Sequence, residues 1–190
     1  MKPKKNYVPG PMDVCFTPEY GILPILPYIK GLKVWECASG KGHLVNRMRK
    51  NGNIVVETDI NMGVDFLTQD CPDDFDVIVT NPPFGLKYKF IERCYEIGKP
   101  FALLMPVETH GAKASQIYFE KYGIETIWLR PRISFCMPNK GWSASGAQFP
   151  TAWFCYNLVG KENSWFDFNK EQEYKDWKMY LKKNSFLIQP

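Results

Sequence analysis

The residues best suited to chemistry in this chain are those at 81–84, which read Asn-Pro-Pro-Phe. They directly follow the apolar run at 75–80, which has the pattern of a strand. Proline has no N–H, so this turn cannot continue a ladder or a helix and must project outward. A carboxamide, a free carbonyl and a ring at the rim of a sheet suit a flat, amine-bearing group such as a nucleobase. An ordinary Pro-Pro loop is the alternative interpretation.

A second candidate is the turn at 36–42, which reads Glu-Cys-Ala-Ser-Gly-Lys-Gly between an expected strand and an expected helix. Its small residues, Ala38, Gly40 and Gly42, would let a ligand lie close against the backbone. The spacing fits neither a phosphate-binding loop nor Gly-x-Gly-x-x-Gly, and Glu36 would repel a pyrophosphate. The turn therefore favours a cationic ligand, although a plain strand–helix turn can have the same composition.

Carboxylates follow at two further places. Asp59 ends the next expected strand, roughly 20 residues after the glycine turn, where it could accept hydrogen bonds from ribose hydroxyls. Glu57 shares its face of the strand and ranks second. Asp65 could accept from an adenine amino group while Phe66 lies on the ring, or it could be a helix N-cap. Because ligands bind at the carboxyl edge of a parallel sheet, these residues predict one site there.

The expected elements would bring these residues together. Short apolar strands alternate with helices, which indicates a parallel sheet covered on both faces. We expect strands at 32–37, 53–59, 75–80 and 101–105, and helices at 18–29 (Thr17 as N-cap), 41–51, 90–97 and 113–122. Two later strands, at 124–129 and 152–159, flank a segment rich in Pro, Gly, Ser and Asn, which predicts an antiparallel pair joined by a long substrate loop at 130–150. Residues 169–184 have the spacing of an amphipathic helix.

Composition limits the class of protein. The 190 residues, 45% of them hydrophobic, fit a single catalytic domain spanning 1–190, with an extended arm at 1–15 and no separate target-recognition domain. No apolar run approaches the roughly 20 residues that span a bilayer, so we expect no membrane partner. The net charge of +4 tolerates a polyanionic partner without requiring one. The sequence leaves the oligomeric state open.

Cysteine usage indicates a reducing compartment. The six cysteines are scattered, none forms Cys-x-x-Cys, and only two histidines accompany them. This pattern favours reduced thiols in the cytoplasm and argues against a metal site.

These motifs resemble a known family. In order, Glu36–Gly42, Asp59, Asp65-Phe66 and Asn81–Phe84 look like the motifs of S-adenosylmethionine-dependent amino-methyltransferases, especially the DNA adenine-N6 methyltransferases. Phe16-Thr17-Pro18 is similar to the segment that precedes the glycine turn in one subgroup. Cys37 and Lys41 depart from the commoner proline and small residue. The resemblance implies a Rossmann-like class I methyltransferase fold: a mostly parallel seven-stranded α/β sheet, helices on both faces and a C-terminal antiparallel hairpin.

The resemblance also implies roles. S-adenosylmethionine would be the cofactor, held by Phe16, Thr17, Glu36, Ala38, Gly40, Gly42, Asp59, Ile60, Asp65, Phe66 and Asn81. Asn81 and Pro82 would grip the amine, while Pro83 and the stacking ring of Phe84 would contact the target. The loop mixes cations with a ring, as nucleic-acid grooves do, or is simply solvated; its candidates are Arg130, Arg132, Lys140 and Trp142.

The leading hypothesis is therefore methyl transfer to the N6 amine of adenine in DNA, with the base flipped or single-stranded. One alternative is adenine in structured RNA, and another is the side-chain amide of a protein glutamine. A related motif ending in Tyr serves glutamine, so Phe84 favours a base. A non-enzymatic partner subunit that binds cofactor or nucleic acid is the remaining alternative.

Overall fold

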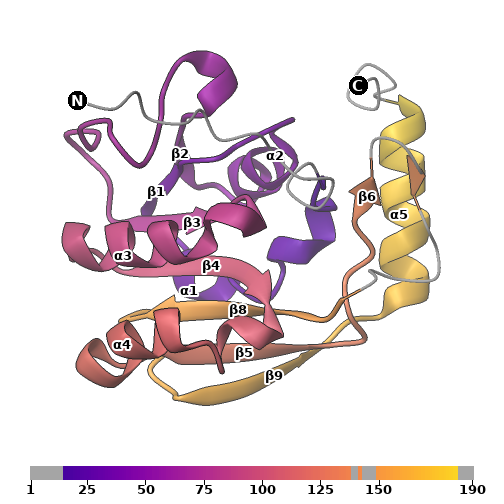
Figure 1. Cartoon of the computed structure of the whole chain (residues 1–190). Coiled ribbons are helices and arrows are strands. Elements are labelled where there is room, and N and C mark those ends of the chain that lie inside the picture. The colour runs from indigo at the N-terminus through magenta and orange to yellow at the C-terminus, as the bar shows by residue number, and fades with distance from the viewer. Residues whose placement is uncertain (1–14, 138–140, 143–148, 184–190) are drawn as a thin grey trace.

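One mixed sheet with helices on both faces organises the chain (Figure 1). The computed structural model describes residues 15–137, 141–142 and 149–183. Within these ranges the sheet has seven strands in the order β2-β1-β3-β4-β8-β5-β9. The strands are β1 Lys33–Glu36, β2 Ile54–Glu57, β3 Val77–Thr80, β4 Phe101–Pro106, β5 Glu125–Arg130, β8 Thr151–Tyr156 and β9 Asn163–Asp167.

Strand direction places most carboxyl ends at one edge. The strands β2, β1, β3 and β4 pair in parallel, and β9 is parallel to β5. Only β8 runs the other way, antiparallel to both β4 and β5. The predicted fold class, including the antiparallel pair β5–β8 with a long connection, is confirmed.

Each face of the sheet has its own core, because successive side chains of a strand point to opposite faces. On one face Val34, Val79 and Trp153 pack with η1 Glu19–Ile22, α1 Leu26–Ile29, α2 His43–Lys50 and α5 Lys170–Lys183. On the other face Trp35 and Ile78 pack with α3 Lys87–Ile97 and α4 Lys113–Tyr122.

Some element boundaries differ from those predicted. The helix expected at 18–29 is two short helices, η1 and α1, since Pro24 between them has no N–H to donate. The N-cap of η1 is Pro18, without a side-chain hydrogen bond, so Thr17 is not the cap. The strand expected to reach 159 ends at Tyr156, before Asn157 with its left-handed φ of 49°.

Two pairings were not predicted. The edge strand β9 pairs with β5 along its whole length. Within the long connection, β6 Cys136–Met137 and β7 Gly141–Trp142 form a separate antiparallel pair. The expected arm lies almost wholly outside the described residues, which begin at Cys15.

Candidate functional site

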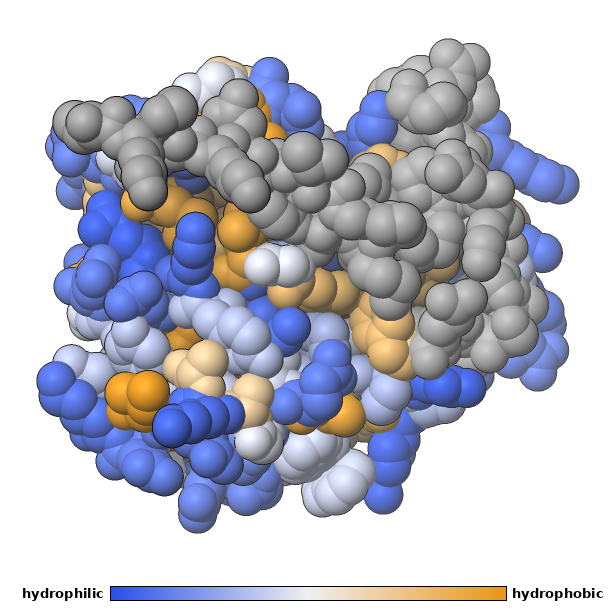
Figure 2. Space-filling view, viewed as in Figure 1, coloured by the Kyte–Doolittle hydropathy of each residue, from blue (hydrophilic) through white to orange (hydrophobic). Residues whose placement is uncertain are grey.

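A cavity of about 1010 Å³ opens at the carboxyl ends of β1, β2 and β3. In the face drawn in Figure 2, an apolar area lies above α3, bordered by hydrophilic surface. The cavity brings together most of the predicted site residues, namely Phe16, Thr17, Glu36, Ala38, Gly40, Asp59, Ile60, Asp65, Phe66, Asn81, Pro82 and Pro83. Its volume is at the upper end of the range for small-molecule sites, roughly 300–1,000 Å³.

Asp59 connects the end of β2 to the glycine turn. Its Oδ2 accepts the Gly40 N–H at 2.8 Å, and its Oδ1 accepts the backbone N–H and side-chain amide of Asn61 at 2.9 and 2.7 Å. Gly40 and Gly42 have φ of 54° and 74°, a region that favours glycine. The carboxylate therefore fixes the turn that forms one wall of the cavity.

Glu36 is a buried acid at the same wall. Its side chain is 1% exposed, and Oε1 accepts the Ala38 N–H at 3.1 Å. Burial raises its pKa to about 8, and the nearby carboxylates of Asp59 and Glu57 add to the rise. A cation in the cavity would relieve both effects, so this wall favours a positively charged ligand.

The side-chain oxygen of Asn81 is a hydrogen-bond acceptor that lacks a donor among the described residues. Asn81 directly follows β3, and its Oδ1 is buried without a hydrogen-bond partner in the part of the chain that the structure describes. Leaving a buried acceptor unpaired costs about 1–3 kcal/mol. Pro82 and Pro83 line the cavity beside it. This arrangement can accept a hydrogen bond from an N–H donor that enters the cavity.

Phe84 lies differently from the sequence expectation. Its side chain is 6% exposed, and its ring packs edge-to-face against Phe135 and Phe149, with centroid separations of 6.2 and 5.3 Å. It is not among the described residues that line the cavity. Its stacking on a target ring stays a prediction, because in this geometry the ring fills the packing between the turn and the long connection.

Three other residues considered from the sequence contribute less to the cavity wall than expected, or do not line it. Phe66 reaches the cavity wall, but its ring is buried and stacked on Phe90 at 4.7 Å. Gly42 does not line the described cavity; it begins α2 as a left-handed N-cap. Glu57 pairs with Arg49 at 3.4 Å, also away from the cavity lining.

The described cavity wall contains none of the loop candidates. Arg132 is exposed and does not contribute to the cavity wall in the described chain. Lys140 lies outside the described residues, and Trp142 belongs to β7, where only the backbone is described.

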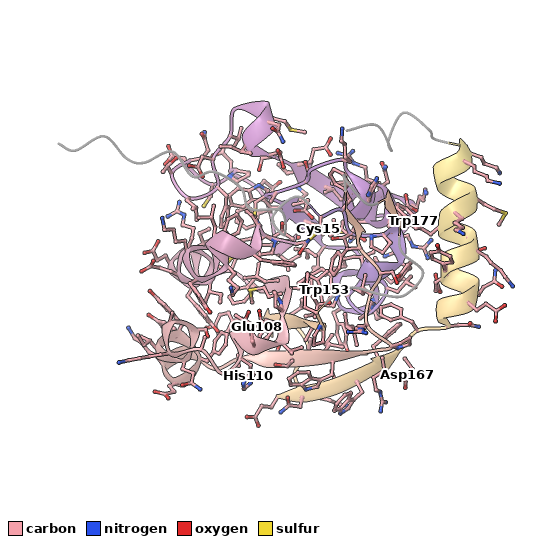
Figure 3. The ribbon with its side chains drawn as sticks, turned by 45° about the vertical axis from the view of Figure 1, so that its right-hand side comes forward. Cys15, Glu108, His110, Trp153, Asp167 and Trp177 are labelled. Atoms are coloured by element: carbon pink, nitrogen blue, oxygen red, sulfur yellow. The ribbon has the colours of Figure 1, made fainter. Side chains whose placement is uncertain are left out.

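Sequence reasoning missed His43. This residue lines the cavity, and its Nδ1 lies 3.2 Å from the Thr17 carbonyl oxygen. Burial lowers the pKa of His43 to about 4, so the ring is neutral at pH 7. Trp177 of α5 packs against it, with ring centroids 4.9 Å apart, and Figure 3 shows Trp177 on the side of α5 that faces the sheet. The sequence feature that could have indicated His43 is its position at the start of α2, directly after the glycine turn.

Ser39 was missed as well. It lines the cavity, and its buried Oγ has no hydrogen-bond partner among the residues placed by the structure. Its signal was membership of the glycine turn itself, where only the small residues and Glu36 were given roles.

The described ranges contain neither a metal-binding cluster nor a membrane-spanning helix. No group of three or more His, Cys, Asp or Glu side chains there could hold a metal ion. No helix in the same ranges has the length and apolar character to cross a membrane. The cysteines whose side chains are described, Cys15, Cys37, Cys71, Cys94 and Cys155, are free thiols.

Comparison with solved structures identifies proteins of similar fold. No protein-family model and no curated protein matches the sequence. A candidate class I S-adenosylmethionine-dependent methyltransferase from Listeria monocytogenes has a TM-score of 0.53 at 12% identity, covering 97% of this chain and 75% of that one. A candidate RNA methyltransferase from Pyrococcus horikoshii has a TM-score of 0.51 at 14% identity, covering 75% of this chain and 80% of that one.

A third solved structure is the methyltransferase subunit of a type I restriction-modification system from Streptococcus thermophilus. Its TM-score is 0.47 at 16% identity, and the match covers 91% of this chain but 53% of that subunit. The two matches above a TM-score of 0.5 show that the chain has the Rossmann-like fold of class I methyltransferases.

Proposed function

We propose that this protein transfers a methyl group from S-adenosylmethionine to the N6 amine of adenine in DNA, with the base flipped out or single-stranded. The observation that carries the proposal is the buried, unpartnered Oδ1 of Asn81 at the wall of a cavity that also contains Glu36 and Asp59. An acceptor for an amine and acids for a cationic cofactor thus share one space.

The cavity residues fit S-adenosylmethionine. Glu36, whose carboxyl is buried beside other acids, suits the methionine ammonium. Asp59 would accept from the ribose hydroxyls, and Asp65 from the adenine amino group. Ile60 lies on the cavity wall with 66% of its surface exposed, available to cover a ring. When bound, the cofactor supplies a methyl group already activated by its sulfonium.

The chain's own contribution is to hold the acceptor amine. An exocyclic amine is a poor nucleophile because its lone pair is delocalised into the ring. The Asn81 Oδ1 and the Pro82 carbonyl oxygen would accept its two hydrogens, turning the nitrogen toward a tetrahedral geometry that localises the pair. Asparagine is not a base, so its role is alignment and charge placement.

Pro83 and Phe84 have different roles in this proposal. Pro83 lines the cavity and would lie against the target ring. Stacking by Phe84 would require its ring to leave Phe135 and Phe149, so we assign Phe84 the positioning of the turn.

Radiolabelled-methyl transfer to DNA, RNA and bulk protein, measured in parallel, tests the proposal. We expect label in DNA, recovered as N6-methyladenine after hydrolysis to nucleosides. Label in RNA alone would mean that the substrate is RNA, with the same chemistry at adenine. Label in protein glutamine would mean that the substrate is a protein and not a nucleic acid. Cofactor binding without transfer to any of the three would indicate a binding subunit and contradict the enzyme assignment.

A further inference from the structure

Aromatic and cationic side chains form a row on the α4 side of β5 and β9, half-buried at Trp128 and exposed at the other positions. Trp165 of β9 is 60% exposed, and its ring centroid lies 5.8 Å from that of Trp128 on β5. The Arg130 guanidinium lies 4.7 Å from the Trp165 centroid. At the other end, His110 lies 6.2 Å from Trp128. We call these four residues the rim platform.

The rim platform is held in place by polar contacts. Trp128 donates its indole N–H to Asn163 at 3.1 Å. Arg130 makes two contacts with the Asp167 carboxylate, at 2.9 and 3.0 Å. Because these side chains are already fixed, a ligand that stacks on them pays little ordering entropy.

The rim platform shares the sheet edge of the cavity. Arg130 ends β5, and His110 follows the turn η4 Val107–Thr109 after β4, the neighbour of β3 with its Asn81. Figure 3 labels His110 and Glu108 after β4 and Asp167 at the end of β9. Strands lie about 4.8 Å apart, so β9, the fourth strand beyond β3, is about 19 Å from it. A few nucleotides span that distance.

We propose that the rim platform binds single-stranded nucleic acid that flanks the target base, by stacking unpaired bases on Trp165 and Arg130. This inference rests on the proposed function. Every base has a π-face, so such stacking tolerates any sequence. Asp167 neutralises Arg130, so the contact is with bases and not with phosphates.

Fluorescence anisotropy with labelled oligothymidylate tests the inference, since this probe contains no adenine to methylate. We expect Trp165→Ala to weaken binding about 5- to 150-fold and Trp165→Phe to retain most of the affinity. The slope of log affinity against log salt should stay unchanged, because no phosphate contact is lost. Tyr28→Ala removes an exposed ring from α1, on the opposite face of the sheet, and should leave binding unchanged.

Three results would overturn the inference: binding by Trp165→Ala within twofold of wild type, a reduced salt slope in that variant, or equal losses in Trp165→Ala and Tyr28→Ala. Sedimentation adds a fourth, because a dimer that Trp165→Ala converts to monomer would make the platform a self-association surface. Failure of the proposed function would instead be seen in the transfer assay as unlabelled nucleic acid. Asn81→Ala should lose methyl transfer in that assay and should still bind oligothymidylate in the anisotropy measurement.

Discussion

Glu36 ends β1 and Asp59 lies just beyond the end of the neighbouring strand β2, and the two acids have different surroundings. Asp59 accepts three N–H hydrogen bonds from Gly40 and Asn61, whereas Glu36 accepts one from Ala38 in a fully buried position. Asp59 therefore stabilises the glycine turn through its hydrogen bonds. The negative charge of an ionised Glu36 is not compensated in this way, so a cation bound beside it would be stabilising.

The buried acid predicts a pH dependence of stability. The pKa of Glu36 is about 8 in the folded protein, against 4.5 for an ordinary glutamate. Between these values the folded state keeps a proton that the unfolded state has lost. The free energy of unfolding should therefore fall as pH rises through this interval, by up to about 1.4 kcal/mol per pH unit from this group.

Urea denaturation of wild type and Glu36→Gln from pH 4 to 9 isolates that contribution. The variant should lack the Glu36 part of the slope, so its stability relative to wild type should increase with pH. Parallel curves for the two proteins would show that Glu36 titrates normally.

At this scale the sequence predicted that Glu36, Asp59 and Asn81 would lie together, and all three line the cavity, because the carboxyl ends of parallel strands meet at one edge. Glu36 ends β1, Asn81 directly follows β3 and Asp59 lies just beyond the end of β2, so their meeting required only the strand order. His43 was missed since the direction of its ring depends on tertiary contacts, including that with Trp177 of α5. The packing of the Phe84 ring could not be predicted from its own segment, because Phe135 and Phe149, which contact it, lie far along the chain.

Among elements, the turn at 81–84 packs against the described residues of the connection between β5 and β8. Phe84 contacts Phe135, and Ser134 beside it donates its N–H to the Tyr20 hydroxyl at 2.9 Å. The turn after β3, the connection and η1 are therefore joined through buried side chains.

A double-mutant cycle on Phe84→Leu and Phe135→Leu tests this packing. Edge-to-face aromatic pairs contribute about 0.5–1.5 kcal/mol beyond area burial, so we expect a coupling of that size in the free energy of unfolding. A cycle of Phe84→Leu with Tyr122→Leu, a ring on α4 at the other face, should show no coupling. Additive losses for the first pair would remove the positioning role of Phe84.

The elements themselves were predictable to different degrees. Residues 113–122 form α4 as expected, since helical spacing persists without interruption. The edge strand β9 was missed because its exposed and half-buried side chains alternate without an apolar run. Tertiary pairing with β5, which no local pattern reveals, makes it a strand.

For the whole molecule, α5 closes one face of the sheet. Trp177 is buried in the core that also contains Tyr20 and Phe168, and its ring contacts His43 at the cavity. The terminal helix therefore connects the stability of the fold to the shape of the site.

Trp177→Ala should lower the free energy of unfolding by about 3 kcal/mol or more, the usual loss for a buried tryptophan. Met179→Ala, at a position 56% exposed on the same helix, should change it by less than about 0.5 kcal/mol. Chemical denaturation of both variants gives the comparison. Equal, small effects would show that α5 does not pack on the core as described.

The most direct test of the central claim is methyl transfer to adenine-containing DNA by Asn81→Ala, with S-adenosylmethionine affinity measured in parallel. Removing the acceptor should lower turnover about 100- to 1,000-fold, as loss of one transition-state hydrogen bond does, and change cofactor affinity less than threefold. Asn81→Asp, which keeps an acceptor oxygen at the same place, should retain more turnover than Asn81→Ala. Near-wild-type turnover by Asn81→Ala would contradict the account.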